Sequence, residues 1–266
     1  VLAGKSTADD FKTEEIEPKS ILDNASPVTK EDLEEQLLKD FNELLSGDEE
    51  EILNATDLVM HSINLEPGTL PKAVSTRRLP DEMKKEVDRQ VKEMLANGTI
   101  RKSASPWASA IVMQRKGDRS KPPTSWRLCV DYKQTLNPAT VKDRYPMPNL
   151  DEALDAFSNV SYISTLDCNK GFNQIRMDPR AIPLTAFTTH VGLFEYIRMP
   201  FGLANAPATF QRLMDRVLSG YIGKICKGYI DDMLVYTKDY GNPFVNLRMH
   251  AYHLTLIFRR LKTARL

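Results

Sequence analysis

The chain has 266 residues, of which 41% are hydrophobic, so it can bury the core of one large domain or of two smaller ones. Three widely separated cysteines without a C-x-x-C pair argue against a disulfide framework and a zinc site, and no stretch approaches the roughly twenty apolar residues of a membrane span. The net charge is zero, yet residues 1–55 carry 16 acidic and 5 basic side chains, which leaves +11 on the remainder. A basic body suits nucleic acid, and it is equally typical of an ordinary solvated surface.

Residues 1–55 are predicted to form an acidic segment that is partly disordered and contains one amphipathic helix. Residues 1–28 mix charged residues, Ser and Pro without periodicity, which is typical of a linker. Thr29 is then a candidate N-cap with Asp32 three residues later, and a stripe of Leu and Phe side chains continues until Gly47.

The next elements are a helix over residues 80–98, which ends at Asn97-Gly98, and two strands over residues 108–114 and 125–132. A basic loop that contains proline joins these strands. A further strand over residues 161–168 ends in an acidic residue, and a strand pattern recurs around residues 194–201.

Two more helices are predicted near the C-terminus. The first covers residues 206–220, and the second covers HLTLIFRRLK, residues 253–262, after the connecting stretch GNPFVNLRMHAY. Helices and strands therefore mix irregularly, which favours an α+β fold over a doubly wound sheet.

The segment GYIDDMLVY, residues 228–236, places adjacent Asp231 and Asp232 between two apolar runs. It predicts a strand, a tight turn and a second strand, with Asp231 near the tip. An ordinary hairpin that uses Asp as a turn residue is one explanation. A divalent cation that relieves the repulsion between neighbouring carboxylates is another.

Asp167 closes the strand-like run of residues 161–168, just as Asp231 lies beside one. If the two strand ends are adjacent in one sheet, Asp167, Asp231 and Asp232 form a single cluster. Three carboxylates hold two divalent cations in enzymes that transfer phosphoryl groups, and Mg²⁺ prefers such oxygen ligands.

Four longer segments occur in order: WRLCVDYKQTLNPATVKDRYPMP, STLDCNKGFNQIRMD, TAFTTHVGLFEYIRMPFGLANAPATFQRLM and GYIDDMLVY. Together they closely resemble the reverse transcriptase of gypsy-type long-terminal-repeat retrotransposons, a part of the Pol polyprotein. HSINLEPGT, RRLP and SPWASAIV upstream are also similar to that family, and the resemblance runs from about His61 to Tyr236.

The resemblance implies the following site. Asp167, Asp231 and Asp232 would be the catalytic carboxylates, which bind two Mg²⁺ ions (or Mn²⁺) together with the backbone carbonyl of Cys168. Lys116 and Arg127 would bind the triphosphate, with Arg115 as the alternative to Lys116. Phe172 would block a ribose 2′-hydroxyl, and Tyr229 would contact the primer end. The residues implied for the floor of the nucleotide pocket are Phe201, Gly202, Asn205 and Pro207.

The resemblance also implies a right-hand polymerase fold, with an antiparallel palm sheet backed by helices. The fingers would cover residues 56–145 and 175–206, and the palm residues 146–174 and 207–266. In the family a thumb, a connection and a ribonuclease H domain follow; the chain is expected to be truncated before them.

The implied activity is RNA-directed DNA polymerisation on a template with a primer, using deoxynucleoside triphosphates. The other Pol domains, including protease and integrase, are implied partners. The resemblance also implies a cytoplasmic virus-like particle, leaves nuclear passage open, and gives no membrane role.

An inactive nucleic-acid-binding relic of a decayed element is the alternative function. A two-metal nuclease would use similar acids, but it would not explain the aromatic residue Phe172.

Overall fold

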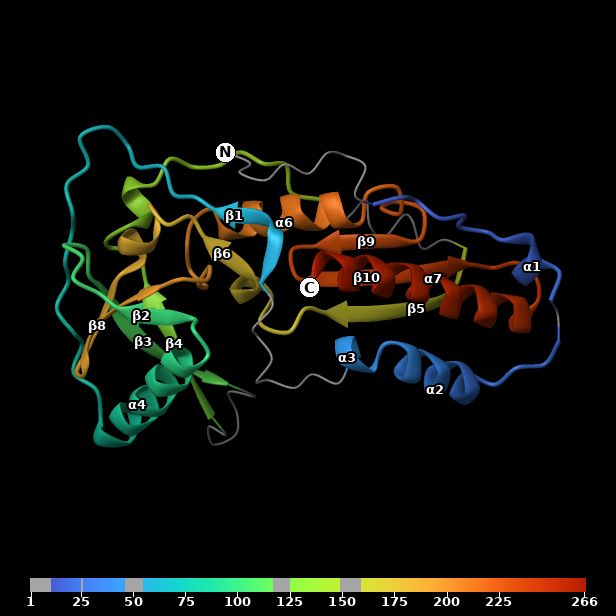
Figure 1. The fold of residues 1–266 in the computed structure, drawn as a ribbon, viewed down its shortest axis with the longest axis horizontal. Helices are drawn as coiled ribbons and strands as arrows, with labels where there is room; N and C mark the ends of the chain where they lie inside the picture. Colours follow the sequence, from blue (N-terminus) through green and yellow to red (C-terminus); the bar gives the residue numbers. More distant parts are fainter. Residues whose placement is uncertain (1–10, 25, 46–54, 117–124, 149–158) are drawn as a thin grey trace. The chain divides into compact units, whose positions relative to one another are not determined.

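A computed structural model describes residues 11–24, 26–45, 55–116, 125–148 and 159–266. Their helices and strands follow in an irregular order along the chain (Figure 1): α1 Lys19–Leu22, α2 Lys30–Asp40, α3 Asn42–Leu45, β1 Thr56–His61, α4 Asp81–Ala96, β2 Ile100–Lys102, β3 Ser109–Lys116, β4 Ser125–Asp131, β5 Val160–Asp167, β6 Ile175–Met177, β7 Phe187–Thr189, β8 Gly192–Tyr196, α6 Ala206–Val217, β9 Cys226–Tyr229, β10 Asp232–Lys238 and α7 Pro243–Ala264. Parallel and antiparallel strand pairs both occur, which confirms the predicted α+β class. None of the helices in these ranges is long and apolar enough to cross a bilayer.

The chain divides into two compact units. Apart from the ranges that the structure does not describe, the first holds residues 50–144 and 172–209, and the second holds residues 4–49, 145–171 and 210–266. The divisions after residues 144, 171 and 209 lie within three residues of the predicted boundaries between fingers and palm, whereas residues 4–49, predicted as a separate segment, belong to the second unit.

The first unit contains a five-stranded sheet of order β2-β8-β7-β3-β4 and a two-stranded pair of β1 with β6. Helix α4 packs against β2 and β4 through its buried face, which includes Val87 and Val91. The predicted hairpin of β3 and β4 is confirmed, while its connecting loop lies outside the described residues.

The strand predicted over residues 194–201 is shorter than expected. Strand β8 ends at Tyr196, because the next residues leave the sheet: the N–H of Ile197 donates to Thr99 and that of Met199 to Ile175. Phe201 consequently lies in a turn.

The second unit contains an antiparallel sheet of order β5-β10-β9, against which α7 packs (Figure 1). His250 and His253 of α7 are buried, and both bind the hydroxyl of Thr237 on β10, at 2.9 and 2.8 Å. They are therefore structural histidines whose ring nitrogens have hydrogen-bond partners.

Helix α7 begins ten residues before the predicted helix over residues 253–262, so the interpretation of GNPFVNLRMHAY as a connection is wrong for most of its length. The Asn242 side chain accepts bonds from the N–H groups of Phe244 and Val245, and Pro243 occupies the first helical turn. Asn246 and His250, both buried, interrupt the apolar pattern that would have indicated this half of the helix.

The single helix predicted between Thr29 and Gly47 is divided. Thr29 and Asp32 form the predicted capping box of α2, but the helix stops at Phe41, whose φ is −126°. The Phe41 ring packs on Phe258 of α7 with centroids 5.3 Å apart, and α3 continues the chain.

The linker predicted over residues 1–28 lies outside the described residues at 1–10 and 25, while its described part packs along α7. We call residues 11–24 and 26–27 the N-terminal strap. Its backbone carbonyls accept hydrogen bonds from three α7 side chains: Arg260 to Lys12 (3.0 Å), Tyr252 to Glu15 (2.9 Å) and Arg248 to Ser26 (3.1 Å). Acceptors on the backbone leave no trace in the sequence, which is why the segment reads as a linker.

We predict that Arg260 holds the strap. This buried guanidinium donates to the carbonyls of Val217 (3.1 Å) and Lys12 (3.0 Å), and it lies over the rings of Phe11 and Tyr221. Replacing it in Arg260→Met removes charged hydrogen bonds and leaves the carbonyl of buried Val217 without this donor. We expect a loss of about 2–4 kcal/mol in the free energy of unfolding, measured by urea denaturation.

The matched control is Arg259→Met. Arg259 is adjacent but exposed, and within the described residues its one ion pair is with Glu14 at 2.8 Å, so its loss should cost less than about 1 kcal/mol. Equal losses in the two variants would contradict the role of Arg260.

Candidate active site

Three carboxylates meet at one end of the sheet of the second unit. In the β5–β10 ladder Asp232 lies directly opposite Asp167, and Asp231 occupies the turn just before β10. The N–H of Cys168 donates to the carbonyl of Asp231 at 3.3 Å, which ties the end of β5 to this turn. The structure thus brings together the residues 167, 231 and 232 that the sequence predicted as one cluster.

The turn that carries Asp231 has a strained backbone. Ile230 has φ of +57°, in the left-handed region that β-branched residues seldom adopt. Gln211 of α6 is fully buried, and its side-chain oxygen accepts the N–H of Ile230 at 2.9 Å while its amide donates to Asp215 at 2.9 Å. Gln211 therefore fixes the backbone of the turn through its hydrogen bond to Ile230.

Gly171 allows a close approach of backbone to the acids. A Cβ at this position would lie 3.2 Å from the Cβ of Asp231, 3.2 Å from the Phe210 ring and 3.3 Å from the Cβ of Cys168. Any larger residue would push against Asp231 and the helix beneath it.

Mutual repulsion is visible in the electrostatics of the cluster. Burial, followed by the charges of Asp231 and Asp232, raises the pKa of Asp167 above its ordinary value. Burial and the same three carboxylates raise the pKa of the Cys168 thiol to about 12, so this thiol stays protonated at neutral pH. Cys168 can offer a cation its carbonyl oxygen and not a thiolate.

The donor set fits a hard divalent cation such as Mg²⁺, because it consists of carboxylate and carbonyl oxygens whose repulsion a cation would relieve. Within the part of the chain that the structure describes, no group of three His, Cys, Asp or Glu side chains is already arranged around one metal position. The carboxylates would have to turn toward a common point on binding.

A second cluster lies in the first unit and contains three predicted substrate-binding residues. The guanidinium of Arg127 lies 5.6 Å from the centre of the Phe201 ring, and Phe201 packs on Phe172 with centroids 4.9 Å apart. Phe172 is mostly buried, whereas Phe201 and Arg127 are exposed. A cation beside an exposed aromatic surface is suited to a nucleotide, with the cation on phosphate.

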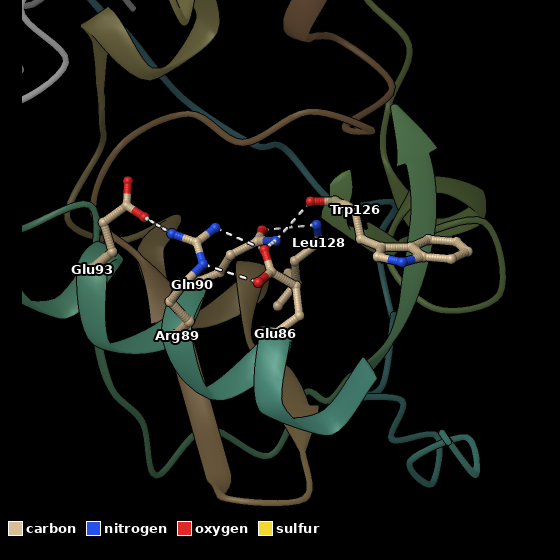
Figure 2. Close-up of polar contacts among 6 residues, drawn as sticks. All are labelled: Glu86, Arg89, Gln90, Glu93, Trp126 and Leu128. Carbon is tan, nitrogen blue, oxygen red and sulfur yellow. Dashed lines mark hydrogen bonds and ion pairs between the residues drawn. The ribbon is translucent and has the colours of Figure 1, made fainter. Parts of the chain in front are cut away.

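Arg127 is positioned by an interaction that the sequence did not reveal. Strand β4 is an edge strand, and Gln90 of α4 pairs with it as a neighbouring strand would: its amide donates to the Trp126 carbonyl at 2.8 Å and its oxygen accepts the Leu128 N–H at 3.0 Å (Figure 2). These two bonds flank Arg127 on both sides and fix its backbone.

The loop that carries Phe201 and Gly202 is held by two asparagines. Gly202 has φ of +93°, and a Cβ there would lie 3.2 Å from the Val130 carbonyl. Asn137 donates to the Gly202 carbonyl at 2.9 Å, and Asn205, predicted for the floor of the pocket, donates to the Val141 carbonyl at 2.8 Å.

Two predicted residues lie outside these clusters. Lys116 ends β3 opposite Ser125, and its side chain lies outside the described part of the structure. Tyr229 ends β9 opposite Asp232 and is 38% exposed, so it is available to a ligand beside the carboxylates.

Gln90, Asn137, Gly171 and Gln211 were not predicted as site residues. Gln211 carried a usable signal, because it is a polar residue on a helix with a strongly apolar face. Asn137 and Gly171 stand inside the quoted motifs, but neither spacing nor composition distinguishes them from their neighbours.

Comparison with known proteins gives a consistent result. The family described as "Reverse transcriptase (RNA-dependent DNA polymerase)" matches residues 115–266, more than half of the chain. The chain is 40% identical over 219 residues, 82% of its length, to the retrovirus-related Pol polyprotein from transposon 297 of Drosophila melanogaster. It is 44% identical over 170 residues, 64% of its length, to that from transposon opus of the same organism. The chain spans only 20% and 17% of these two curated relatives.

Solved structures show a similar fold. The foamy viral protease-reverse transcriptase in complex with an RNA/DNA hybrid matches 92% of this chain with a TM-score of 0.71 at 21% identity, over 31% of its own length. The native prototype foamy virus protein gives a TM-score of 0.73 at 20% identity over the same shares.

We predict that Gly171→Ala disturbs the carboxylate cluster. Its methyl group must displace Asp231 or Phe210 by a few tenths of an ångström, and such overpacking costs about 1–3 kcal/mol of stability. The measurements are the free energy of unfolding and the rise in melting temperature on adding Mg²⁺, which should be smaller than for the unsubstituted chain.

Gly228→Ala is the matched control, since its Cβ would meet only Leu218, at an ordinary 3.7 Å. It should leave the free energy of unfolding within about 0.5 kcal/mol of its original value and the Mg²⁺-dependent rise in melting temperature unchanged. A harmless Gly171→Ala would show that the close approach to Asp231 is unimportant.

Proposed function

This chain belongs to the reverse transcriptase (RNA-dependent DNA polymerase) family, and from that membership we propose that it carries the polymerase chemistry of a retrotransposon Pol polyprotein. The reaction would add deoxynucleotides to a primer 3′-hydroxyl on an RNA or DNA template and release pyrophosphate. The observation that carries the proposal is the register that sets Asp232 opposite Asp167 with Asp231 in the adjoining turn.

We assign the second unit to the palm and the first to the fingers. The antiparallel sheet β5-β10-β9 with α7 against it supports the palm assignment, because it carries all three acids. The interleaving of the two units along the chain supports the assignment as well.

Asp167, Asp231 and Asp232, with the carbonyl of Cys168, would hold two Mg²⁺ ions. Bound Mg²⁺ would activate the primer hydroxyl, neutralise the phosphates and stabilise the leaving oxygen. The residues around the acids keep them close despite repulsion: Gln211 supports the turn and Gly171 leaves room below it.

Substrate binding would involve the first unit. Arg127 offers a planar fork to the triphosphate of a deoxynucleotide, with Lys116 as a second cation. Phe172, fixed against Phe201, would block a ribose 2′-hydroxyl, and Gly202 would keep the loop close to the nucleotide. Tyr229, exposed next to the acids, would contact the primer end.

We propose a primed template as the polymeric partner. Two observations support this: a foamy viral protein of similar fold is described in complex with an RNA/DNA hybrid, and residues 56–266 have a net charge of +11. The other Pol domains are proposed partners because the curated relatives are polyproteins several times longer than this chain.

Primer extension tests the function. We expect Mg²⁺-dependent extension by this chain when it is lengthened by any coding sequence that follows Leu266, since a duplex clamp would help retain the primer. Asp231→Asn should lower the rate at least about 100-fold, equivalent to about 2.7 kcal/mol of transition-state stabilisation.

Asp23→Asn is the control, because it removes the same charge at the exposed C-cap of α1 and should extend normally. Equal extension by Asp231→Asn would refute the assignment of the acids. Template binding without extension by any unsubstituted form would favour the inactive relic.

Phe172→Ala tests the steric gate. Removing the ring should reduce the preference for deoxynucleotides over ribonucleotides, expressed as the ratio of their kcat/KM values, by about 10- to 200-fold. Phe172→Tyr keeps the ring and should keep the ratio. A ratio that Phe172→Ala leaves unchanged would show that the ring serves packing against Phe201 alone.

A further inference from the structure

Two arginines of the first unit, one in β6 and one just after β8, lie opposite each other. Arg176 of β6 forms an isolated antiparallel bridge with Arg198. The flanking residues make the hydrogen bonds: Met177 N–H donates to Ile197 at 2.9 Å and Met199 N–H to Ile175 at 2.8 Å. Arg176 and Arg198 are therefore a non-hydrogen-bonded pair, the kind in which opposite side chains come closest and share one face.

Arg198 is nearly buried, with 8% of its surface exposed. Its guanidinium donates to the Asn173 carbonyl at 3.3 Å, and no carboxylate among the described residues lies within ion-pair distance of it. Burial and the charge of Arg176 both lower the pKa of Arg198. A buried cation beside a like charge, with one neutral acceptor, destabilises the folded chain unless an anion joins it.

Arg176 lacks a strong partner as well. Its one ion pair in the described structure is with Asp57, at 3.7 Å, and both side chains are more than half exposed, so this pair contributes little. Two guanidinium groups on one face, one of them held by the backbone, can together offer several N–H donors to one oxyanion.

We propose that Arg176 and Arg198 bind one phosphodiester group of the template-primer nucleic acid. This inference rests on the proposed function, and it adds a backbone contact on the first unit that is separate from Arg127 and Lys116. A phosphodiester suits the pair because its single negative charge and two free oxygens match two adjacent cations, and because fixing the backbone needs no sequence information.

The test measures binding of a fluorescein-labelled DNA template-primer duplex to the full chain by anisotropy, from about 50 to 200 mM salt. The slope of log K against log salt reports the number of phosphates neutralised. We expect the double variant Arg176→Gln, Arg198→Gln to bind more weakly, with a slope shallower by about 0.9, the loss of one phosphate contact.

The matched control is Arg89→Gln, which removes the same charge from an arginine already paired with Glu86 (2.7 Å) and Glu93 (3.0 Å) (Figure 2). Its slope should equal that of the unsubstituted chain. A double variant that behaves like this control would overturn the inference.

Stability provides a second readout that separates ligand binding from a structural role. In the absence of nucleic acid, Arg198→Gln should raise the melting temperature, because it removes a buried charge beside a like charge. A fall in melting temperature with an unchanged salt slope would mean that Arg198 merely supports the Asn173 carbonyl, which refutes the inference. Should Arg198→Gln fail to fold, Arg176→Gln alone, at an exposed position, must still make the slope shallower.

Competition distinguishes the source of the phosphate. A free deoxynucleoside triphosphate should displace the duplex equally from the unsubstituted chain and from Arg176→Gln. A displacement by triphosphate that the substitution abolishes would assign the pair to the nucleotide and refute the inference.

If the unsubstituted chain binds no duplex, the proposed function fails. If it binds the duplex and the double substitution leaves the salt slope unchanged, only this inference fails.

Discussion

The register between β5 and β10 is the constraint on which the rest of the second unit depends. Along β10 the side chains of Met233, Val235, Tyr236 and Thr237 are buried, whereas Asp232 at the start of the strand is exposed opposite Asp167. A slip of one residue would turn the acids into the core and the apolar residues into water. The buried residues thus enforce a contact between like charges that the acids themselves oppose. Packing of α7 against these strands supplies the free energy that keeps the acids together, and the strained turn at Ile230, held by Gln211, sets where Asp231 stands.

Several features of the chain reduce its stability locally and share one explanation. The acids repel one another, Ile230 adopts a left-handed backbone, and Arg176 faces Arg198 in the ladder. Each arrangement is unfavourable in the free protein. A bound cation would relieve the first, and the proposed phosphodiester would relieve the third. Edge strand β4 is different: Gln90 binds the Trp126 carbonyl and the Leu128 N–H, which fixes the backbone on both sides of Arg127. The proposed role of Arg127 in binding an anionic substrate would benefit from such a fixed backbone.

Sequence patterns correctly predicted the elements that depend on the local periodicity of residues. They failed for residues whose hydrogen-bond partners lie far away in the sequence. The strand predicted over residues 161–168, the end of α4 at Asn97-Gly98 and the hairpin around Asp231 are local, and the structure confirms them, with β5 at Val160–Asp167. The acids were expected to meet because two strand ends were expected to be neighbours. The first half of α7 was missed because buried Asn246 and His250 bond to Asp239, Ser161, Ser164 and Thr237, which makes polar residues fit an apolar position. Gln90 and Gln211 were missed for the same reason: their partners are backbone groups 17 to 38 residues away, which no spacing rule reveals.

The N-terminal strap shows why charge asymmetry along a sequence is a poor guide to docking. An acidic segment beside a basic body suggests electrostatic attachment, and two such pairs exist, Glu14 with Arg259 and Glu17 with Lys238. Both are largely exposed and therefore weak. The bonds that fix the strap go instead from side chains of α7 to backbone carbonyls, and the strongest candidate, Arg260, is buried among aromatic rings. Salt should accordingly do little to release the strap. Because α7 also packs against the strands that carry the carboxylates, the strap and the candidate active site belong to one cooperative unit. Detaching the strap from α7 should therefore also destabilise the carboxylate cluster.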